Sequence, residues 1–362
     1  MILFIGPEQS PVTGQSVSFN ETYRLCSNNK IILHYSSRNS SVLKSIFLFL
    51  FRFIYIFFKN LNNLKLIYIT NSRTLAGFFR DAFVIMLCYI FKKKVIIHVH
   101  GFDFSTFRNL SSSCIKFFID LTYNHIDTII ILHEKLREQY KHYKSVNIVV
   151  VNNFQNIPMS VNGAKLKIEN VKSNNKIKLL FFSNLIKEKG YIDAINATKL
   201  LVKNGINVEL NIVGGLVQSD KSNNITKNQL IKMIKNYDYI NYHGCVIGAE
   251  KNDILFNSDI LLFPSYYKVE AVPIVIIEAM ASACAIITTN HNLLPYLVCS
   301  ESGIIVEKKS PEALAYAVTT LYNNRNTLSD KMKYNFDMSH REMTENVYKK
   351  SINLIIEKNL GI

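Results

Sequence analysis

Short apolar runs rich in β-branched residues alternate with longer helix-like stretches along the whole chain. This alternation is typical of a parallel sheet with helices on both faces. The runs of the first half lie at residues 2–5, 31–34, 66–69, 95–100, 128–132 and 147–151. Those of the second half lie at residues 178–182, 208–213, 240–243, 260–263, 285–289 and 303–306. The pattern predicts an α/β protein with two doubly wound parallel sheets in tandem, facing a central cleft, with ligands bound just after the strands.

A polar stretch that contains Pro and Gly, residues 152–175, separates the two series of runs. We expect the boundary between two domains near residues 158–175, because few contacts cross such linkers. The predicted domains comprise residues 1–165 and 166–340. Residues 341–362 are expected to form a C-terminal helix that could fold back on the first domain.

Composition narrows the class of protein. Of the 362 residues, 48% are hydrophobic and 19% are charged, so the chain is too apolar to be disordered. The six cysteines share no metal-ligand spacing and are too dilute for a disulfide framework, which indicates a reduced, intracellular protein. The N-terminus lacks the basic region of a signal peptide, so no secretion is expected.

The net charge of +15 is concentrated in the first half of the chain. Residues 1–172 hold 21 Lys and Arg against 9 Asp and Glu, whereas residues 173–362 hold 21 against 18. This excess suggests an anionic partner, either nucleic acid or the surface of an anionic membrane. We find no zinc-finger, RRM or K-homology signature and no Arg-rich recognition helix, so no nucleic-acid partner is expected.

The strongest motif is the stretch 263–281, which reads FPSYYKVEAVPIVIIEAMA. A strand ends at Phe263, a loop carries Glu270, and Pro273 can open a helix whose free N–H groups would hold a phosphate. Glu278 follows about one turn later in an apolar run, where a carboxylate needs partners. Two carboxylates would repel a diphosphate, so both are expected to accept hydrogen bonds from sugar and ribose hydroxyls. The alternative for Glu278 is an ordinary surface glutamate.

A second motif, FSNLIKEKG at residues 182–190, follows the first strand of the second domain. Lys189 is expected near the start of the next helix, where the macrodipole disfavours a cation unless an anion is also bound. This placement favours a diphosphate ligand. The alternative is a solvated surface turn.

In the first domain, His98 and His100 stand at the end of a predicted strand and would share one face of it. Two histidines are too few for a catalytic zinc site, and they are equally well explained as packed side chains. The turn-rich loop 6–16 follows the first strand and suits close backbone approach to a phosphate, but it lacks a dinucleotide-binding or P-loop signature.

The E-x7-E spacing of Glu270 and Glu278, with the EAVP and EAMA elements, resembles the donor-site signature of the family 4 retaining glycosyltransferases. The resemblance covers nearly the whole chain and is strongest from residue 177 to 306. It implies the GT-B fold of two Rossmann-like domains, an acceptor-binding N-terminal domain and a donor-binding C-terminal domain. It also implies a nucleoside-diphosphate sugar as substrate and no cofactor or metal. The chain has no D-x-D motif, which argues against the metal-dependent site of the other common glycosyltransferase fold.

The resemblance also implies roles for individual residues. Glu270 would face the transferred sugar and Glu278 the ribose, while Lys189 would hold the diphosphate and His100 would lie next to the sugar. The catalytic candidates are therefore His100, Glu270 and Lys189. The family usually has Arg where this chain has Asn184, which removes one fixed charge from the diphosphate site. The expected donor-binding residues are Gly14, Asn184, Lys189, Cys245, Val246, Glu270, Ala271, Val272, Pro273, Ile274 and Glu278.

The stretch 44–59 is almost wholly apolar. As a helix, residues 46–58 would span about 20 Å against roughly 30 Å of hydrocarbon, so they cannot cross a bilayer. Ser45, Arg52 and Lys59 recur every seventh residue as a narrow polar stripe. We favour an interfacial helix on anionic lipid over a core helix, with Phe49, Phe53 and Phe57 facing the lipid.

These observations predict a bacterial retaining glycosyltransferase that transfers a sugar from a nucleoside diphosphate to a glycan or glycolipid acceptor. A polyprenyl-diphosphate-linked saccharide of capsule or O-antigen assembly is the expected acceptor, and the inner face of the cytoplasmic membrane is the expected location. Two alternatives remain open. One is another GT-B enzyme such as a sugar-nucleotide epimerase, and the other is a non-catalytic sugar-nucleotide-binding subunit of an envelope assembly complex.

Overall fold

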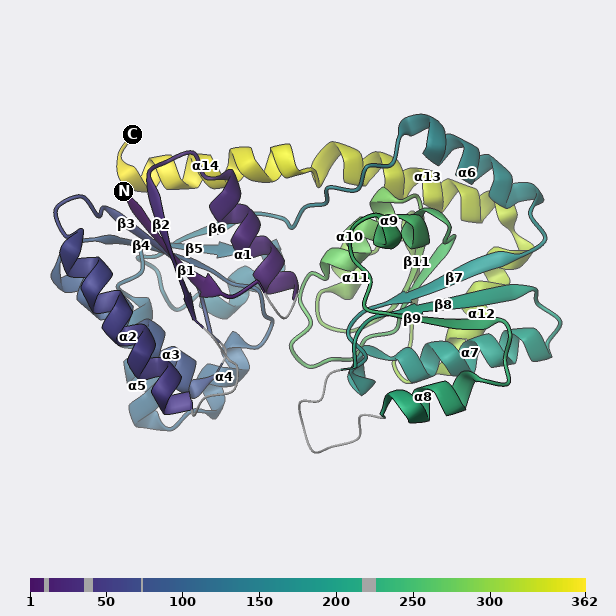
Figure 1. The fold of residues 1–362 in the computed structure, drawn as a ribbon, viewed down its shortest axis with the longest axis horizontal. Coiled ribbons are helices and arrows are strands. Elements are labelled where there is room, and N and C mark those ends of the chain that lie inside the picture. Colours follow the sequence, from purple (N-terminus) through teal and green to yellow (C-terminus); the bar gives the residue numbers. More distant parts are fainter. Residues whose placement is uncertain (10–12, 36–41, 73, 217–225) are drawn as a thin grey trace. The chain divides into compact units, whose positions relative to one another are not determined.

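The computed structural model describes residues 1–9, 13–35, 42–72, 74–216 and 226–362 (Figure 1). Contacts within the chain divide it into two compact units. Unit 1 comprises Met1–Asn153 together with Asn346–Ile362, and unit 2 comprises Phe154–Glu345.

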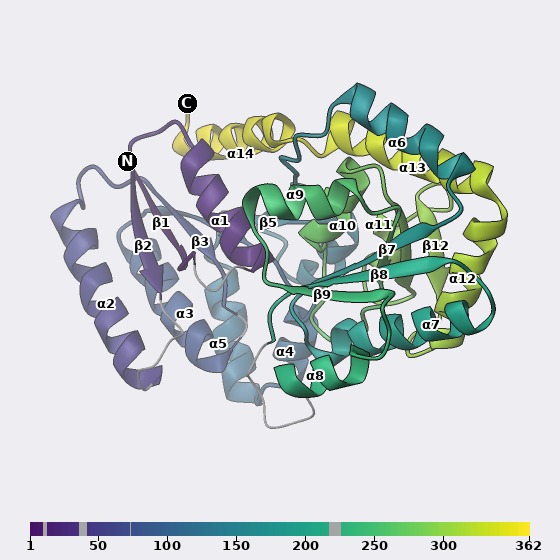
Figure 2. The same ribbon diagram turned by 45° about the vertical axis from the view of Figure 1, so that its right-hand side comes forward.

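Unit 1 contains a six-stranded parallel sheet in the order β2-β1-β3-β4-β5-β6. Its strands are β1 (Ile2–Pro7), β2 (Lys30–Tyr35), β3 (Leu66–Thr70), β4 (Lys94–His98), β5 (Thr128–Ile131) and β6 (Asn147–Val150). Its helices are α1 (Gly14–Leu25), α2 (Val42–Lys59), α3 (Leu75–Ile90), α4 (Phe104–Leu110), α5 (Ser113–Tyr123), the 3-10 helix η1 (Glu134–Tyr140) and α14 (Glu345–Leu360). Figures 1 and 2 show α2, α3 and α5 on one face of the sheet and α1 and α14 on the other.

Unit 2 contains a second six-stranded parallel sheet, in the order β12-β11-β10-β7-β8-β9. Its strands are β7 (Ile177–Phe182), β8 (Val208–Val213), β9 (Ile240–Gly244), β10 (Ile260–Phe263), β11 (Ala285–Thr289) and β12 (Gly303–Val306). Its helices are α6 (Val161–Ser173), η2 (Lys187–Lys189), α7 (Tyr191–Lys203), α8 (Lys227–Ile234), α9 (Gly248–Phe256), α10 (Ile274–Ala281), α11 (Leu294–Leu297), α12 (Pro311–Asn323) and α13 (Arg325–Glu342). The strand order reverses between β7 and β10, so the carboxyl ends of these two strands form a topological switch point.

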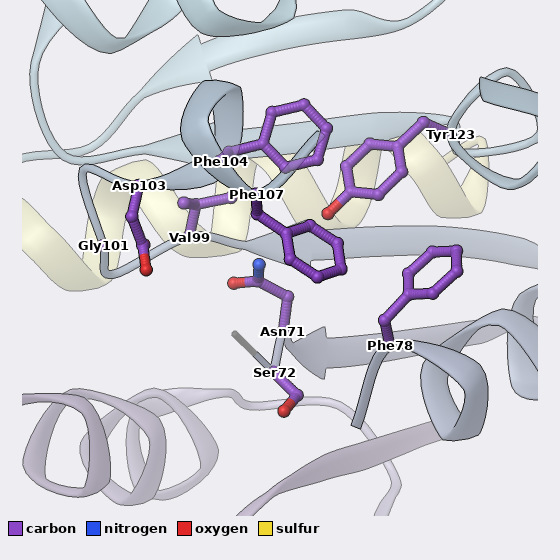
Figure 3. A pocket seen from close by; sticks show the side chains of 9 residues that line it. All are labelled: Asn71, Ser72, Phe78, Val99, Gly101, Asp103, Phe104, Phe107 and Tyr123. Atoms are coloured by element: carbon purple, nitrogen blue, oxygen red, sulfur yellow. The ribbon is translucent and has the colours of Figure 1, made fainter. Parts of the chain in front are cut away.

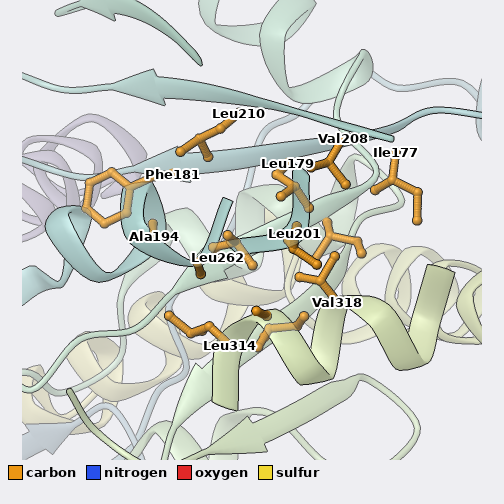
Figure 4. Close-up of a cluster of buried hydrophobic side chains, with 14 of the residues drawn as sticks. Ile177, Leu179, Phe181, Ala194, Leu201, Val208, Leu210, Leu262, Leu314 and Val318 are labelled. Atoms are coloured by element: carbon orange, nitrogen blue, oxygen red, sulfur yellow. The ribbon is translucent and has the colours of Figure 1, made fainter. Parts of the chain in front are cut away.

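Apolar side chains on one face of this second sheet pack against α7 and α12 (Figure 4). Leu179 of β7 and Leu262 of β10 are fully buried, as is Leu201 of α7. Because helices cover the sheet, central strands such as β10 and β11 are buried along their whole length. This burial explains why the strands appear in the sequence as continuous apolar runs.

All twelve predicted runs form strands, and the predicted α/β class with two doubly wound parallel sheets is confirmed. The predicted strand 95–100 is shorter in the structure, because β4 ends at His98. His100 therefore lies in the loop after the strand. The expectation that both histidines belong to one strand was wrong, although their ring centroids are only 4.2 Å apart.

Most of the stretch expected as a linker is the helix α6, which begins after its N-cap Ser160. Ala164 and Val171 of this helix are buried, and the Lys167 ammonium donates to the carbonyl of Ser282 at 2.5 Å. A narrow apolar stripe is enough for a helix to pack against its neighbours. Because the other residues of α6 are mostly polar, its sequence resembles that of a linker. Unit 2 therefore begins before α6, at Phe154, and not at the predicted residue 166.

The side of α2 that faces the core differs from the expectation. Phe49, Phe53 and Phe57 are buried, with exposed fractions of 4%, 0% and 0%. Phe53 packs edge-on against Phe83 of α3. The expectation that these three phenylalanines face lipid was wrong, because the helix is apolar on both sides and its sequence does not mark which side meets the sheet. Within the described ranges, no helix is both long and apolar enough to cross a membrane.

The C-terminal helix α14 belongs to unit 1 through a buried tyrosine. The Tyr348 side chain is 2% exposed, and its hydroxyl lies 2.5 Å from the Thr22 hydroxyl and 3.3 Å from the Ser18 hydroxyl of α1. Near the other end of α14, the Asn359 side-chain oxygen accepts a hydrogen bond from Thr128 of β5. These contacts join the last helix of the chain to its first helix and its first sheet.

Candidate functional site

The loops that follow β7 and β10 meet at the switch point of unit 2. Gly190, directly after η2, has φ of +83°, and a Cβ atom there would lie 2.4 Å from the carbonyl oxygen of Pro264. Only glycine satisfies both conditions. This close approach brings the predicted motifs 182–190 and 263–281 into contact.

Lys189 and Glu270 form a buried ion pair at this point. The Lys189 ammonium lies 2.5 Å from a Glu270 carboxylate oxygen, and the side chains are only 14% and 8% exposed. The Ser265 hydroxyl donates to the same oxygen at 2.8 Å. The ammonium also lies 5.0 Å from the centre of the Tyr267 ring. Two of the three catalytic candidates are therefore in direct contact, as a largely buried pair of one positive and one negative charge.

Side chains of the segment after β11 form hydrogen bonds with the backbone of the loop that carries Glu270. The Asn292 amide donates to the carbonyl oxygens of Glu270 at 2.9 Å and of Lys268 at 3.1 Å. A His291 ring nitrogen lies 2.9 Å from the carbonyl oxygen of Tyr267. These contacts fix the backbone of the loop independently of the ion pair. Neither His291 nor Asn292 belongs to a motif that would mark it in the sequence.

Glu278 lies on α10, which begins directly after Pro273. Its carboxylate accepts a hydrogen bond from the Lys251 ammonium of α9 at 2.8 Å, and the two side chains are 14% and 21% exposed. The carboxylate thus has the partner that its apolar setting requires. Lys251 was not predicted from the sequence, because a lysine on a polar helix has no distinguishing signal.

The start of α10 can accept an anion. Pro273 is the N-cap residue and provides no side-chain cap to the first turn. The N–H groups at the start of a helix carry partial positive charge and bind anions such as phosphate. Ala271 and Val272, on the loop before it, have buried side chains, whereas Ile274 is half-buried. Ala271 and Val272 therefore offer a ligand their backbone more readily than their side chains.

The remaining candidates of unit 2 follow β7 and β9. Asn184 is half-buried in the loop after β7. A Cβ atom on Gly214 would lie 1.8 Å from the Ser183 carbonyl oxygen, so this loop and the end of β8 are closely packed. Cys245 is exposed beside Gly215, whereas Val246 is 6% exposed and packs in the core with β10 and α10. The Cys245 side chain is thus accessible, and that of Val246 is part of the core.

In unit 1, a small cavity lies beyond the carboxyl ends of β3 and β4 (Figure 3). Its volume of about 20 Å³ holds roughly one water molecule. The polar side chains that line it are those of Asn71, Ser72, Asp103 and Tyr123. It is lined by Asn71, Ser72, Phe78, Val99, Gly101, Asp103, Phe104, Phe107 and Tyr123. His100 lies in the chain between the two lining residues Val99 and Gly101.

The two histidines differ in their surroundings. His98 is fully buried, and its Nδ1 lies 2.5 Å from the Tyr68 hydroxyl. Burial, together with the nearby His100, holds the pKa of His98 well below its ordinary value. His98 is therefore a neutral packed histidine, as one of the two interpretations expected. His100 is half-buried.

Gly14 is the first residue of α1, and the Thr13 side chain caps this helix by accepting from the Ser16 N–H. Residues 10–12 of the loop 6–16 lie outside the described residues. A Cβ on Gly6 would lie 2.4 Å from the Phe19 ring, so this glycine serves the packing of α1 on β1. Among the residues that the structure describes, no group of three or more His, Cys, Asp or Glu side chains is placed to hold a metal ion.

Comparisons with known proteins agree with this architecture. Residues 164–337, which lie within unit 2, match the family model described as "Glycosyl transferases group 1". A capsular polysaccharide biosynthesis glycosyltransferase, CapM of Staphylococcus aureus, is 26% identical over 49% of this chain and 44% of its own length. An uncharacterized glycosyltransferase of Methanocaldococcus jannaschii is 26% identical over 70% of this chain and 64% of its own length. The chain thus covers less than two thirds of each of these relatives.

Among solved structures, HepE of Anabaena in complex with UDP and glucose is similar with a TM-score of 0.73 and 14% identity, covering 99% of both chains. Sucrose-phosphate synthase of Thermosynechococcus elongatus has a TM-score of 0.73 and 15% identity, with the same coverage. At these identities the similarity shows the fold alone, which is the GT-B class of two parallel-sheet domains.

Proposed function

We propose that this protein is a retaining glycosyltransferase that transfers a sugar from a nucleoside diphosphate to an acceptor. The observation that carries the proposal is the buried pair of Lys189 and Glu270 at the switch point of unit 2, with Glu278 on the adjoining helix α10. Ligands of doubly wound sheets bind at such switch points. The match of residues 164–337 to a glycosyltransferase family model supports the assignment.

The donor would bind to unit 2 by charge and hydrogen-bond complementarity. A diphosphate would take the Lys189 ammonium and the N–H groups at the start of α10, beside the backbone of residues 271–274. Glu270 would accept from hydroxyls of the sugar and Glu278 from those of the ribose, with Asn184 and Cys245 as further contacts in unit 2. The family resemblance adds Gly14 of unit 1 as a proposed donor contact. Similar structures include complexes with UDP and with UDP-glucose, which supports a nucleoside-diphosphate sugar as the donor.

The proposed reaction retains the configuration of the sugar. The bond between the anomeric carbon and the diphosphate oxygen breaks, and the acceptor hydroxyl oxygen bonds to that carbon on the same face. The acceptor proton passes to the leaving phosphate oxygen. Lys189 and the helix N–H groups stabilise the charge that develops on this oxygen, and His100 and Glu270 position the sugar. We propose that neither a metal nor a cofactor takes part.

For the acceptor we propose a polyprenyl-diphosphate-linked saccharide in bacterial surface polysaccharide synthesis. The similarity to a capsular polysaccharide biosynthesis enzyme supports this class, and the positive first half of the chain supports an anionic membrane as the site of action. The protein would then act peripherally on the inner face of the cytoplasmic membrane.

Asn184 supports a second candidate function. The family resemblance leads us to expect Arg at this position, and the loss of that charge would weaken the hold on the leaving diphosphate. A non-catalytic sugar-nucleotide-binding subunit would tolerate this loss of charge. The remaining alternative, an epimerase, would consume the donor without any acceptor.

Product analysis separates these candidates. A thermal-shift screen of uridine, guanosine and thymidine diphosphate sugars selects the donor, and the full chain is then incubated with that donor with and without polyprenyl-linked saccharide. A transferase yields a heavier lipid by mass spectrometry only when the acceptor is present. Donor consumption without acceptor indicates an epimerase, and tight donor binding with no product in either case indicates a binding subunit.

A further inference from the structure

The side of α2, α3 and α5 that points away from the sheet of unit 1 is strongly apolar. Figures 1 and 2 show these helices side by side, and α3 packs against both others. We call their exposed side the three-helix face. Of the 27 large apolar side chains exposed among the described residues, 15 belong to these three helices. Such a concentration on one face marks an interaction surface, whereas single exposed apolar residues do not.

On α2, the exposed apolar side chains are not the ones that attach the helix to the rest of unit 1. Its buried side consists of Phe49, Phe53 and Phe57, whereas Phe47, Phe51 and Tyr55 are 71%, 67% and 60% exposed. Both rows follow the four-residue spacing that places side chains along one side of a helix. Because the first row already fills the contact with the protein interior, the second row stays exposed, and its Tyr55 contacts Lys59 one turn later on the same helix.

The positive charge of this segment indicates which kind of partner binds to the three-helix face. Residues 42–123 contain eleven Lys and Arg but only three acidic residues, Asp81, Asp103 and Asp120. Asp81 is paired with Arg80 and Asp120 with Arg108. On α2 itself, Lys44, Arg52 and Lys59 are exposed, so this surface is cationic as well as apolar. In a symmetric dimer the same surface would meet itself and its like charges would repel, so a second copy is a poor occupant.

We infer that the three-helix face rests on an anionic lipid bilayer. Phe47, Phe51 and Tyr55 enter the boundary between headgroups and acyl chains, about 5–10 Å deep, with α2 parallel to the membrane plane. Lys44, Arg52 and Lys59 of the same helix contact the anionic headgroups. This inference rests on the membrane association proposed above and names the protein surface that makes the contact. On α2 the lipid-facing row is Phe47, Phe51 and Tyr55, in place of the row expected from the sequence.

The absence of tryptophan from the chain allows a direct test. Phe51→Trp, at a side chain 67% exposed on α2, places a single fluorophore on the three-helix face. Leu354→Trp is the matched control, since Leu354 is 68% exposed on α14 at the other face of the same sheet. With vesicles of phosphatidylcholine and phosphatidylglycerol, we expect a blue shift and quenching by brominated acyl chains for the α2 probe alone. Equal responses of the two probes, or no response from either, would overturn the inference.

A second experiment measures the energetics by co-sedimentation with the same vesicles. Replacing Phe47, Phe51 and Tyr55 by Ser should lower the partition coefficient by at least about tenfold, which is about 1.4 kcal/mol. The control replaces Leu166, Tyr316 and Leu354, which are similarly exposed on other helices, and should leave it within about twofold. Replacing Lys44, Arg52 and Lys59 by Gln should remove the preference for anionic over neutral vesicles.

Two results would contradict the assignment of the occupant. Unchanged binding of the Phe47, Phe51 and Tyr55 variant would place the contact elsewhere. A wild-type dimer that this variant converts to a monomer in analytical ultracentrifugation would identify a second copy as the occupant. Calorimetry with a soluble nucleoside diphosphate, without vesicles, tests the proposed function separately, because the donor site lies in unit 2.

Discussion

Lys189 and Glu270 are 81 residues apart in sequence, and they meet because β7 and β10 are neighbours in the sheet of unit 2. Each is the main charged partner of the other, in a setting where a single charge would be costly. A ligand that brings both a phosphate and hydroxyl groups can replace the two partners at once. Under the proposed function, the pair would keep the site neutral before the donor binds and would provide both charges to the bound donor.

Replacing Lys189 by Ala should weaken the binding of a nucleoside diphosphate far more than that of the nucleoside. The substitution deletes a charge-assisted contact to the diphosphate, worth about 1.5–3 kcal/mol. Calorimetry with both ligands measures the difference. Equal losses for nucleoside and diphosphate would place Lys189 outside the diphosphate site.

Replacing Glu278 by Gln should weaken nucleotide binding while the melting temperature stays close to that of the wild type. Gln keeps the size of the side chain but halves its capacity to accept hydrogen bonds from ribose hydroxyls. Lys251→Met is the companion variant, because Lys251 orients the carboxylate. If Lys251 acts through Glu278, the double variant loses less affinity than the sum of the single losses. Unchanged affinity of Glu278→Gln removes the ribose role.

Replacing His100 by Ala should lower turnover much more than donor affinity, since the proposed function assigns His100 to the sugar and the donor nucleotide to unit 2. Steady-state kinetics and donor calorimetry on the same preparation separate the two effects. Turnover within a factor of about three of the wild type, near 0.7 kcal/mol of barrier, would show that His100 is not catalytic.

At this scale the sequence identified residues more readily than their contacts. Lys189, Glu270 and Glu278 could be predicted as site residues, because a charged residue in an apolar run or directly after a strand indicates a binding partner. Their contacts could not be predicted. The contact of Lys189 with Glu270 depends on strand order, and Lys251 resembles any lysine on a polar helix. For Val246, the sequence suggested a ligand contact, whereas the structure buries the side chain in the core.

Among the elements, strands were predicted more accurately than the surroundings of helices. A strand covered on both faces leaves a continuous apolar run, as β10 does with ILLF. The helix α6 was taken for a linker because only a narrow stripe around Ala164 and Val171 is buried. For α2 the sequence located the helix, but two apolar sides gave no indication of which one packs inward.

The two sides of α2 make opposite predictions for stability. Phe53→Ala should lower the free energy of unfolding by about 3–5 kcal/mol, because it leaves a cavity between α2 and α3. Phe51→Ala should change it by less than about 0.5 kcal/mol, because its side chain is 67% exposed. Denaturant titrations of the two variants provide the comparison. Similar losses for both would contradict the orientation of α2 described here.

At the scale of the whole molecule, the repeated alternation of runs and helices was sufficient to predict two parallel-sheet units. It did not determine which strands are neighbours. In unit 2 the chain adds β8 and β9 on one side of β7 and then β10, β11 and β12 on the other side. That reversal creates the switch point, so the fold itself sets the place of the candidate site.

The proposed retaining transfer is tested most directly by the anomeric configuration of the product and by the dependence of transfer on the acceptor, Lys189 and Glu270. The full chain is incubated with the selected α-configured donor and the acceptor lipid, and the anomeric configuration of the new linkage is read by proton NMR. We expect an α linkage, formed only with acceptor and lost in Lys189→Ala and Glu270→Ala variants that still fold. A β linkage, or transfer that survives both substitutions, would contradict the account.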